Sequence, residues 1–452
     1  SEADEDSLPV KMADESVCIG PAKSTLSYLN IPAILSAADI TSADAIHPGF
    51  GFLSENSEFA QNCEKWNIAF IGPQIDCIKQ MGDKVLSKKI AQDANVPTLA
   101  PINLTGLSND QVVEKVKELG LPVIIKASAG GGGRGMKKID DLGDLAQSIS
   151  NLREEARAAF GDGTLFIEKY ITNPRHIEVQ ILADKFGNVV HLGERDCTIQ
   201  RRFQKIIEES PSPILDEKTR EDICNKAVEL AKFVKYDSVG TVEFLFDQDT
   251  NQFYFMEMNT RLQVEHPVTE MISGQDLVEW QLRVAAGEVL PKTQEQLVLN
   301  GHAFEARIYA EDANNDFLPA TGKLTLLKTP IESKHVRIDT GVRQGDEVSV
   351  YYDPMIAKLI VWDENRDKAL TRLSKALSEY RIDGVTTNID FLYNLATSKP
   401  FIEENIDTGF IEKNHDLIFH NSPQELLNEL PIAALYLLLS EKKKIQQKAL
   451  QS

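Results

Sequence analysis

The sequence predicts an α/β N-terminal part followed by an α+β part built on antiparallel strands. Over residues 16–72, short apolar runs alternate with helical patterns and end at Gly or Pro, which is typical of parallel α/β structure. A strand, a glycine-rich loop and a second strand are predicted over 122–139. From residue 177 onward the predicted strands lengthen and become antiparallel in character. These observations indicate two kinds of sheet in one chain.

The individual elements follow from local patterns. Three short apolar runs are predicted as strands: Val17–Ile19, Ala43–Ile46 and Ala69–Ile71. Helices are predicted over 84–95, over 110–119 with Gly120 as its C-terminal stop, and over 142–159. A later helix carries one apolar face, formed by Ile223, Ala227, Leu230, Ala231 and Val234.

The last third of the chain is predicted as strand and turn over 300–365, followed by a helix over 365–379. Ser422 and Pro423 open a capping box that predicts another helix start. The basic run over 441–448 is interpreted as a solvated helix face.

Length and charge exclude several classes of protein. The 452 residues are enough for about three domains. The 48 basic and 69 acidic residues give a net charge of −21, which disfavours nucleic acid and anionic membranes as partners. The longest apolar run, Ile432–Leu439, is far shorter than the ~20 residues of a membrane-spanning helix. The 5 cysteines form no close pair, which argues against a zinc cluster or disulfide framework and favours a reducing compartment.

The glycine loop predicts an anion site. Five of the six residues from Gly130 to Gly135 are glycine, so backbone N–H groups can approach a phosphate closely. Lys126 precedes the loop and adds a positive charge. A dinucleotide fingerprint would need a helix next, whereas Met136–Ile139 is predicted as a strand, and the Gly-Lys-Ser/Thr of a P-loop is missing. The alternative interpretation is a flexible linker.

A β-hairpin over 241–261 predicts a metal site. If the hairpin pivots about Thr250, Glu243 lies opposite Glu257. At ~4 Å and an effective dielectric constant near 20, the repulsion between two such carboxylates is about 4 kcal/mol, so the pair needs a cation. Asn259 supplies a third oxygen on the same face, and such ligands suit Mg²⁺ or Mn²⁺.

The same pivot places Phe253 opposite Asp247 and Phe255 opposite Leu245. The alternative is a register shifted by one residue, which would turn one of the two glutamates to solvent.

Three stretches together resemble biotin carboxylase, the ATP-grasp component of biotin-dependent carboxylases. They are the Lys126 glycine loop, His47–Asn56 (HPGFGFLSEN) and Glu257–Glu270 (EMNTRLQVEHPVTE). The resemblance covers about residues 3–415. It implies an ATP-grasp fold with a Rossmann-like N-terminal domain over 1–83, linker helices and a small lid domain over 84–170, and a larger antiparallel-sheet domain over 171–415. Residues 416–452 would begin a linker.

The resemblance also implies roles for individual residues. ATP would be bound by Lys84, Lys126, Gly132, Gly133, Glu168, Lys169, Tyr170, Ile171, His176, Gln200, Glu243 and Glu257. The family's metal ligands match Glu243, Glu257 and Asn259, in agreement with the hairpin argument. The bicarbonate site matches Lys205, Arg261, Gln263, Val264 and Glu265, and the biotin site matches Arg307.

The implied reaction is the first half-reaction of an acyl-CoA carboxylase. Glu265 would act as general base on bicarbonate, which Arg261 orients for attack on the γ-phosphate of ATP. The resulting carboxyphosphate would deliver CO₂ to the ureido nitrogen of biotin, with Arg307 stabilising the biotin enolate. Lys205, Arg261, Glu265 and Arg307 are the expected catalytic residues. The expected cofactors are ATP, Mg²⁺ or Mn²⁺, and biotin.

Three departures from the family pattern modify these expectations. Phe203 stands where the family usually has a polar residue, so a phosphate contact is missing or replaced. No Asn-Arg-Gly-Glu-Ile type sequence opens the fold, which leaves the first sheet short of a strand and an edge unpaired. No Ala-Met-Lys-Met motif occurs, so biotin is expected from another segment or chain.

The tail after residue 420 resembles the start of the linker in acyl-CoA carboxylase α subunits, with methylcrotonoyl-CoA and propionyl-CoA carboxylases as the nearest kinds. This implies a biotin carrier domain, a carboxyltransferase β subunit and a homo-oligomer as partners, in the bacterial cytoplasm or mitochondrial matrix. The absence of an initiator Met suggests a fragment or processed form. The alternatives are another ATP-grasp ligase with a non-biotin acceptor, or a nucleotide-binding scaffold.

Overall fold

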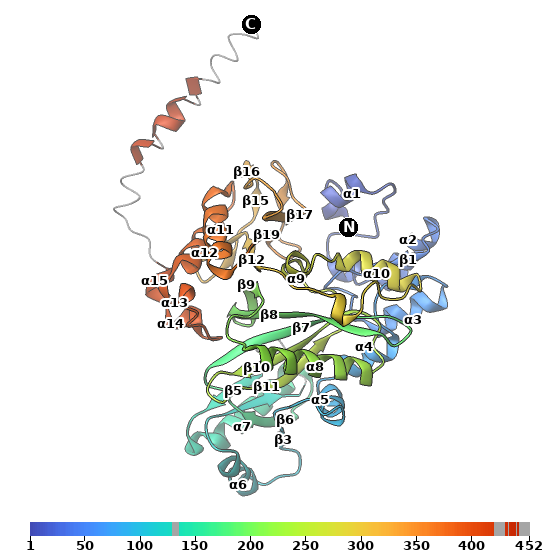
Figure 1. Cartoon of the computed structure of the whole chain (residues 1–452), viewed down its shortest axis with the longest axis vertical. Helices are drawn as coiled ribbons and strands as arrows, with labels where there is room; N and C mark the ends of the chain where they lie inside the picture. The colour runs from blue at the N-terminus through green and yellow to red at the C-terminus, as the bar shows by residue number, and fades with distance from the viewer. Residues whose placement is uncertain (129–134, 420–429, 433, 440, 443–452) are drawn as a thin grey trace.

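The structure is a computed structural model that describes residues 1–128, 135–419, 430–432, 434–439 and 441–442. Its main body and a smaller lobe are separate in outline, and the N-terminus lies on the main body (Figure 1). The expectations for Gly132, Gly133, the capping box at Ser422 and most of the basic run at 441–448 lie outside the described residues.

The N-terminal part is α/β, as predicted, but its sheet is small. Its strands are the parallel pair β1 (Ala45–Ile46) and β2 (Ala69–Phe70), at two of the three predicted positions. Its helices are α1 (Leu8–Met12), α2 (Ile31–Ile40), α3 (Ser57–Lys65) and α4 (Ile75–Gly82). The prediction of a strand at Val17–Ile19 was wrong. This segment pairs with no neighbouring strand among the described residues, so it forms no part of a sheet. Among the described residues β1 pairs only with β2, which agrees with the expected short sheet.

The smaller lobe carries a four-stranded sheet in the order β3-β6-β4-β5. These strands are Ile102–Asn103, Leu165–Lys169, Val123–Ala127 and Met136–Ile139, and the helices are α6 (Asn109–Leu119) and α7 (Leu145–Phe160). The helix α5 (Lys84–Asp93) precedes the lobe. Because β5 follows the glycine loop and pairs antiparallel with β4, the predicted strand–loop–strand arrangement is confirmed. Gly120 ends α6 with φ +77°, as its predicted stop position requires.

The main body is built on an eight-stranded sheet in which every pairing is antiparallel, in the order β11-β10-β7-β8-β9-β12-β19-β17. In chain order the strands are β7 (Pro174–Ala183), β8 (Val189–Arg201), β9 (Gln204–Ser210), β10 (Ser238–Asp247), β11 (Gln252–Asn259), β12 (His302–Tyr309), β17 (Val336–Thr340) and β19 (Met355–Asp363). The pairing of β9 with β12 joins segments about one hundred residues apart, so the sheet is continuous from the hairpins of β7 to β11 to the C-terminal region.

Several helices pack on this sheet and around it. The predicted amphipathic helix is α8 (Glu217–Phe233), which packs on β7 and β8. Four of its five stripe residues are buried, and Val234 is partly buried. The helices α9 (His266–Ser273), α10 (Leu277–Ala285) and α11 (Arg366–Glu379) pack elsewhere on the body. Smaller elements complete the C-terminal region: β13 (Glu311–Asp312), β14 (Leu318–Pro319), β15 (Gly322–Lys323), β16 (Leu326–Lys328), β18 (Glu347–Val348), β20 (Arg381–Asp383), α12 (Ile389–Thr397), α13 (Lys399–Ile402), α14 (Phe410–Lys413) and α15 (His415–Ile418).

The β10–β11 hairpin has the predicted register at its functional end only. Glu243 pairs with Glu257 as predicted. Beyond that pair the register shifts by one, so Phe255 faces Phe244 and Phe253 faces Phe246, and the two predicted pairings there were wrong. The cause is a β-bulge that places the extra residue at Met256, which is exposed.

Within the described residues no helix is both long and apolar enough to cross a membrane. All five cysteines are free thiols.

Candidate functional site

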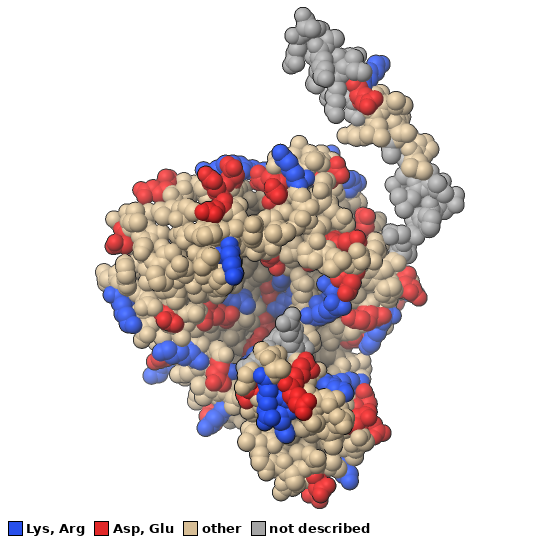
Figure 2. All heavy atoms as spheres, turned by 180° about the vertical axis from the view of Figure 1, so that it is seen from behind, with Lys and Arg blue, Asp and Glu red and all other residues tan. Residues whose placement is uncertain are grey.

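The predicted site residues come from both the smaller lobe and the main body. Figure 2 shows a hollow between these two parts, with basic and acidic side chains together on its walls. Most of the predicted residues lie on strands β7 to β12 of the large sheet and in the loop before α9. Charged side chains on a sheet that is otherwise buried need partners, so their hydrogen bonds define the site.

Lys205 is the centre of the charge cluster. Its Nζ donates to Glu178 Oε2 at 2.5 Å, to Glu265 Oε1 at 2.6 Å and to Glu243 Oε1 at 2.9 Å. All three ammonium hydrogens are therefore used by carboxylates. The three glutamates raise the pKa of Lys205 well above its ordinary value, although burial acts in the opposite direction. Lys205 stays charged at any physiological pH.

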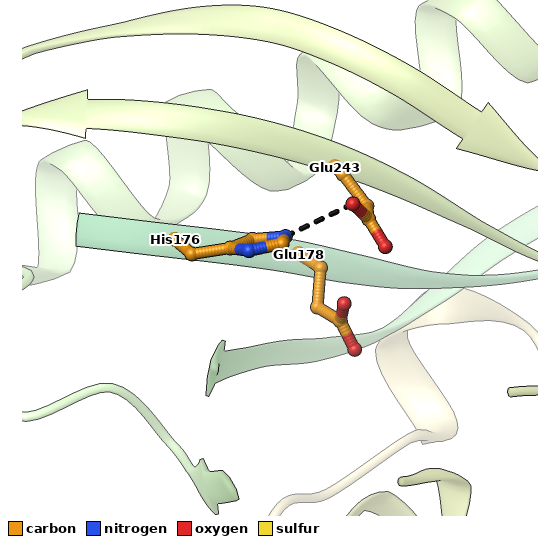
Figure 3. Close-up of side chains that lie close together, drawn as sticks. All are labelled: His176, Glu178 and Glu243. Carbon is orange, nitrogen blue, oxygen red and sulfur yellow. Dashed lines mark hydrogen bonds and ion pairs between the residues drawn. The ribbon is translucent and has the colours of Figure 1, made fainter. Parts of the chain in front are cut away.

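The predicted metal-ligand pair lies beside this lysine. Figure 3 shows Glu243 facing His176 and Glu178 from the neighbouring strand β7, with His176 Nε2 3.0 Å from Glu243 Oε2. Burial and the like charge of Glu243 raise the pKa of Glu257. Burial also acts to raise the pKa of Glu243, but Lys205 and His176 lower it well below the ordinary value. Glu257 is thus the carboxylate whose charge most needs a cation.

Asn259 and Gln263 orient Glu243. Asn259 Nδ2 and Gln263 Nε2 each donate to Glu243 Oε1 at 2.8 Å. Arg261 Nη2 in turn donates to Asn259 Oδ1 at 2.9 Å, and its Nε donates to Glu55 Oε2 at 2.9 Å. The predicted arginine is therefore held at the rim by a glutamate from the N-terminal part.

A fully buried arginine, Arg195 on β8, ties this group to the sheet. Its guanidinium donates to Glu178 Oε1 at 2.5 Å and Gln180 Oε1 at 2.6 Å. It also donates to Gln263 Oε1 at 2.8 Å, and to two threonine hydroxyls, Thr269 at 2.9 Å and Thr241 at 3.1 Å. Every hydrogen-bonding direction of the guanidinium has a partner, which fixes the strands that carry Glu178 and Gln263 relative to each other.

Arg307 on β12 approaches the cluster from the opposite side. Its Nε donates to Glu208 Oε1 at 2.6 Å, and its Nη2 donates to Glu265 Oε2 at 3.0 Å. Glu265 is therefore held on one oxygen by Lys205 and on the other by Arg307. These two cations lower the pKa of Glu265, although burial acts to raise it. In this state the carboxylate is a weak base.

The remaining predicted residues lie around the same hollow. Lys126 on β4 donates to Glu168 Oε2 on β6 at 2.7 Å. Lys169 points away from this pair and donates to the backbone oxygens of Gly120 at 3.0 Å and Leu121 at 3.1 Å. The backbone oxygen of Val264 accepts from Lys358 at 2.7 Å. Ile171 and Gln200 are buried, Tyr170 is half-buried and Lys84 is exposed at the start of α5.

Phe203 occupies the tip of the β8–β9 hairpin. Arg202 and Phe203 both have positive φ, +49° and +68°, as a two-residue type I′ turn requires. The Phe203 side chain is 60% exposed, so no described side chain covers the residue that replaces the family's usual polar one.

Glu305 is a buried carboxyl group for which the described part of the chain offers no hydrogen-bond partner on either oxygen. It pairs in register with Glu208 on β9 and lies near Lys358, Arg307 and Glu265. Burial first, then repulsion from Glu208 and Glu265, raises its pKa well above the ordinary 4.5, against the attraction of Lys358 and Arg307.

A pH-dependent stability follows from Glu305. Because the folded state binds its proton more tightly than the unfolded state, stability is lost as pH rises above about 4.5. We expect Glu305→Gln, which cannot ionise, to raise the melting temperature relative to the parent more at pH 8 than at pH 5. Thermal unfolding of both proteins at the two pH values measures this, with the exposed Glu221→Gln as control. An equal shift at both pH values would show that Glu305 is ionised in the fold.

Family models match consecutive parts of the chain. They are the biotin carboxylase N-terminal domain over residues 1–78, the ATP-binding domain of the carbamoyl-phosphate synthase L chain over 83–293, and the biotin carboxylase C-terminal domain over 305–413. The biotin carboxylase of Nostoc sp. is 49% identical over 413 residues, which cover 91% of this chain and 92% of that protein. The chain belongs to the biotin carboxylase family. The confirmed ATP-grasp fold of this family explains why the lobe and the large sheet enclose the site.

Similarity to other biotin carboxylases extends to solved structures and to larger enzymes. A biotin carboxylase–ATP complex from Campylobacter jejuni is 50% identical, with a TM-score of 0.86 and coverage of 91% of this chain and 92% of that one. The biotin carboxylase domain of Hydrogenobacter thermophilus 2-oxoglutarate carboxylase, in complex with MgADP, ADP and bicarbonate, is 43% identical with a TM-score of 0.86 and coverage of 93% and 92%.

The mitochondrial methylcrotonoyl-CoA carboxylase subunit alpha of Dictyostelium discoideum is 53% identical over 443 residues, 98% of this chain and 63% of that protein. The chain thus spans about 60% of the length of the first curated relatives that it matches.

Three residues of this biotin carboxylase site were missed from the sequence: Glu178, Arg195 and Glu208. Each is a charged residue inside a predicted strand, and each is fully buried. A weak signal existed, because His176, Glu178 and Gln180 alternate with apolar residues and so share one face of β7. Alternation alone does not tell whether that polar face meets solvent or a buried site.

Proposed function

We propose that the chain catalyses the ATP-dependent carboxylation of the ureido nitrogen of biotin with bicarbonate, the first half-reaction of an acyl-CoA carboxylase. The observation that carries the proposal is the position of Glu265, a buried carboxylate whose two oxygens contact Lys205 and Arg307 beside the Glu243–Glu257 pair. A base, two cations that can receive an anion and a candidate metal site are thus next to one another.

We propose Glu243, Glu257 and Asn259 as the residues that would hold Mg²⁺ or Mn²⁺. The fit rests on two opposed carboxylates, of which Glu257 is destabilised by its neighbour. Asn259, two residues further along β11, now turns its nitrogen to Glu243 and its oxygen to Arg261, and it would offer its oxygen to a metal after a turn of the amide. When bound, the metal would neutralise phosphate charge during phosphoryl transfer. Lys84, Lys126, Glu168 to Ile171, His176 and Gln200 are proposed to contact ATP, and Gly132 and Gly133 to belong to the lid loop. The MgADP complex of the Hydrogenobacter relative supports this class of ligand.

The contacts of Glu265 indicate how bicarbonate would become reactive. Lys205 and Arg307 now neutralise Glu265 and weaken it as a base. Bicarbonate bound by Lys205, Arg261, Gln263 and the Val264 backbone would draw hydrogen bonds away from Glu265, so its pKa would rise when its substrate is in place. Glu265 would then take the bicarbonate proton while Arg261 orients the oxygen that attacks the γ-phosphate. ADP would leave as carboxyphosphate forms. Carboxyphosphate would then break down to CO₂ and inorganic phosphate, the phosphate would take the ureido N–H proton, and the CO₂ would bond to that nitrogen of biotin beside Arg307.

The larger context is also proposed. The relatives are carboxylase α subunits, which supports a biotin carrier domain and a carboxyltransferase β subunit as partners, a homo-oligomeric assembly, and methylcrotonoyl-CoA or propionyl-CoA as the final acceptor. The mitochondrial names of the eukaryotic relatives support the mitochondrial matrix, and the bacterial relative supports the cytoplasm. We further propose domain boundaries at residues 83, 170 and 415. The separate apolar cores of the N-terminal part and of the lobe support the first two of these divisions, although α4 and α5 also pack into the core of the main body.

The test is ATP cleavage by the full-length protein with Mg²⁺, bicarbonate and free biotin. We expect ADP release that requires bicarbonate and increases with biotin. ADP release without bicarbonate, driven by another nucleophile, would instead indicate a different ATP-grasp ligase. Calorimetric binding of ATP with no release of ADP would indicate a nucleotide-binding scaffold.

A further inference from the structure

Glu168 on β6 is held by two lysines from different parts of the molecule. Lys126 on β4 reaches one carboxylate oxygen, Oε2, at 2.7 Å. Lys88 on α5, which belongs to neither the lobe's sheet nor the large sheet, contacts the other oxygen, Oε1. The Glu168 side chain is 1% exposed, so its charge depends on these two partners. Figure 1 shows α5 beside the lobe strand β6.

The two lysines differ in how firmly their surroundings hold them beside Glu168. The Lys126 side chain is 29% exposed, whereas that of Lys88 is 16% exposed and its Nζ also lies 5.4 Å from the centre of the Phe166 ring. A cation in contact with both a carboxylate and an aromatic face is fixed by both. Burial lowers the pKa of Lys88, with smaller effects of Lys126 and Lys84 in the same direction, while Glu168 opposes the shift.

Glu168 carries one negative charge and is paired with two lysines, Lys88 and Lys126, in a chain whose net charge is −21. Lys84, one helical turn before Lys88 on α5, acts on Glu257 instead, where it opposes the rise in pKa that burial causes. If Lys88 neutralises Glu168, the charge of Lys126 is available for an incoming anion. Without Lys88, the buried carboxylate would depend on Lys126 and would hold it back.

We propose that Lys88 is a positioning residue for nucleotide binding, a fixed counterion of Glu168 that allows Lys126 to move onto the phosphates of ATP. The inference rests on the proposed function in one respect, since that function places ATP phosphates at Lys126. Lys88 itself acts through Glu168 and need not touch the nucleotide.

The test is ATP binding by the full-length protein, measured by calorimetry without bicarbonate so that no turnover is needed. Lys88→Met keeps the side chain's length and removes its charge. We expect it to weaken ATP binding roughly 10- to 100-fold, the range for one charged hydrogen bond. In the activity assay, the same change should raise KM for ATP and leave kcat at saturating ATP within about twofold. Lys89→Met, on the exposed side of the same helix, is the matched control and should bind ATP like the parent.

Two further variants separate this role from simple structural support. Lys88→Arg keeps the charge and should bind ATP close to the parent. Lys88→Met combined with Glu168→Gln removes the carboxylate that would retain Lys126, so it should bind ATP more tightly than Lys88→Met alone. Unchanged affinity in Lys88→Met, or a double variant that binds no better than Lys88→Met, would overturn the inference. A parent protein that binds ATP but shows no bicarbonate-dependent cleavage would refute the proposed function and leave this binding test valid.

Discussion

Glu265→Gln is expected to lower kcat of bicarbonate-dependent ATP cleavage by roughly 10²- to 10⁴-fold, the usual contribution of a general base. The amide keeps the shape of the side chain and can still accept from Lys205, but it cannot take the bicarbonate proton. The side chain of Glu265 contacts Lys205 and Arg307, neither of which is proposed to bind ATP, so KM for ATP should change by less than about threefold. Initial rates of ADP release at varied ATP and bicarbonate measure both quantities.

The matched control for Glu265→Gln is Glu221→Gln, the same chemical change at an exposed position on α8. It should have parental kinetics and melting temperature. If Glu265→Gln retained more than a tenth of the parental kcat in a folded protein, another group would have to be the base. Glu178 would be the first candidate, because it shares Lys205 with Glu265.

The β10–β11 hairpin shows which strand pairings can be predicted from the local sequence. Simple counting from the turn placed Glu243 opposite Glu257, and like-charge repulsion then predicted a cation site. The same counting failed between that pair and the turn, because the bulge at Met256 shifts the register by one residue. On the turn side of the bulge, Phe244, Phe253 and Phe255 all pack into the core, and β11 lies against α4 and α5. Local sequence patterns do not encode this tertiary packing. The assumed pivot at Thr250 was wrong, and so was the assumption of a hairpin without a bulge. These two errors cancelled at Glu243 and Glu257, so the predicted pairing of these two residues was correct.

Long-range partners could not be predicted in this way. Lys205 was expected in the site by resemblance, but its contacts join β9 to β7, β10 and the loop before α9. Nothing in the local sequence distinguishes Arg195 and Glu208 from charged residues that face solvent. Only the packing of the neighbouring strands shows that both are fully buried. The predicted strand at Val17–Ile19 was also wrong because of long-range structure. A segment with strand propensity forms no strand where no neighbouring strand pairs with it.

Arg195→Met is expected to cause the largest loss of stability. The guanidinium is fully buried and donates to Glu178, Gln180, Gln263 and two threonines. Methionine fills much of the volume but leaves these acceptors without donors, and removal of one partner of a buried ion pair costs about 3–5 kcal/mol. For a domain of this size, that corresponds to a fall of roughly 6–15 °C in melting temperature. Differential scanning calorimetry of parent and variant measures it.

Two companion variants identify the source of that loss. Arg283→Met removes an exposed arginine on α10 that also pairs with two glutamates, and it should leave the melting temperature nearly unchanged because water screens those pairs. Glu178→Gln added to Arg195→Met removes the carboxylate left without its arginine, and should recover part of the melting temperature. No recovery would mean that the amide and hydroxyl partners of Arg195, rather than the Glu178 charge, dominate. If Arg195→Met lowered the melting temperature as little as Arg283→Met does, water would have to reach the Arg195 side chain and screen its ion pair, and burial would not explain its contribution to stability.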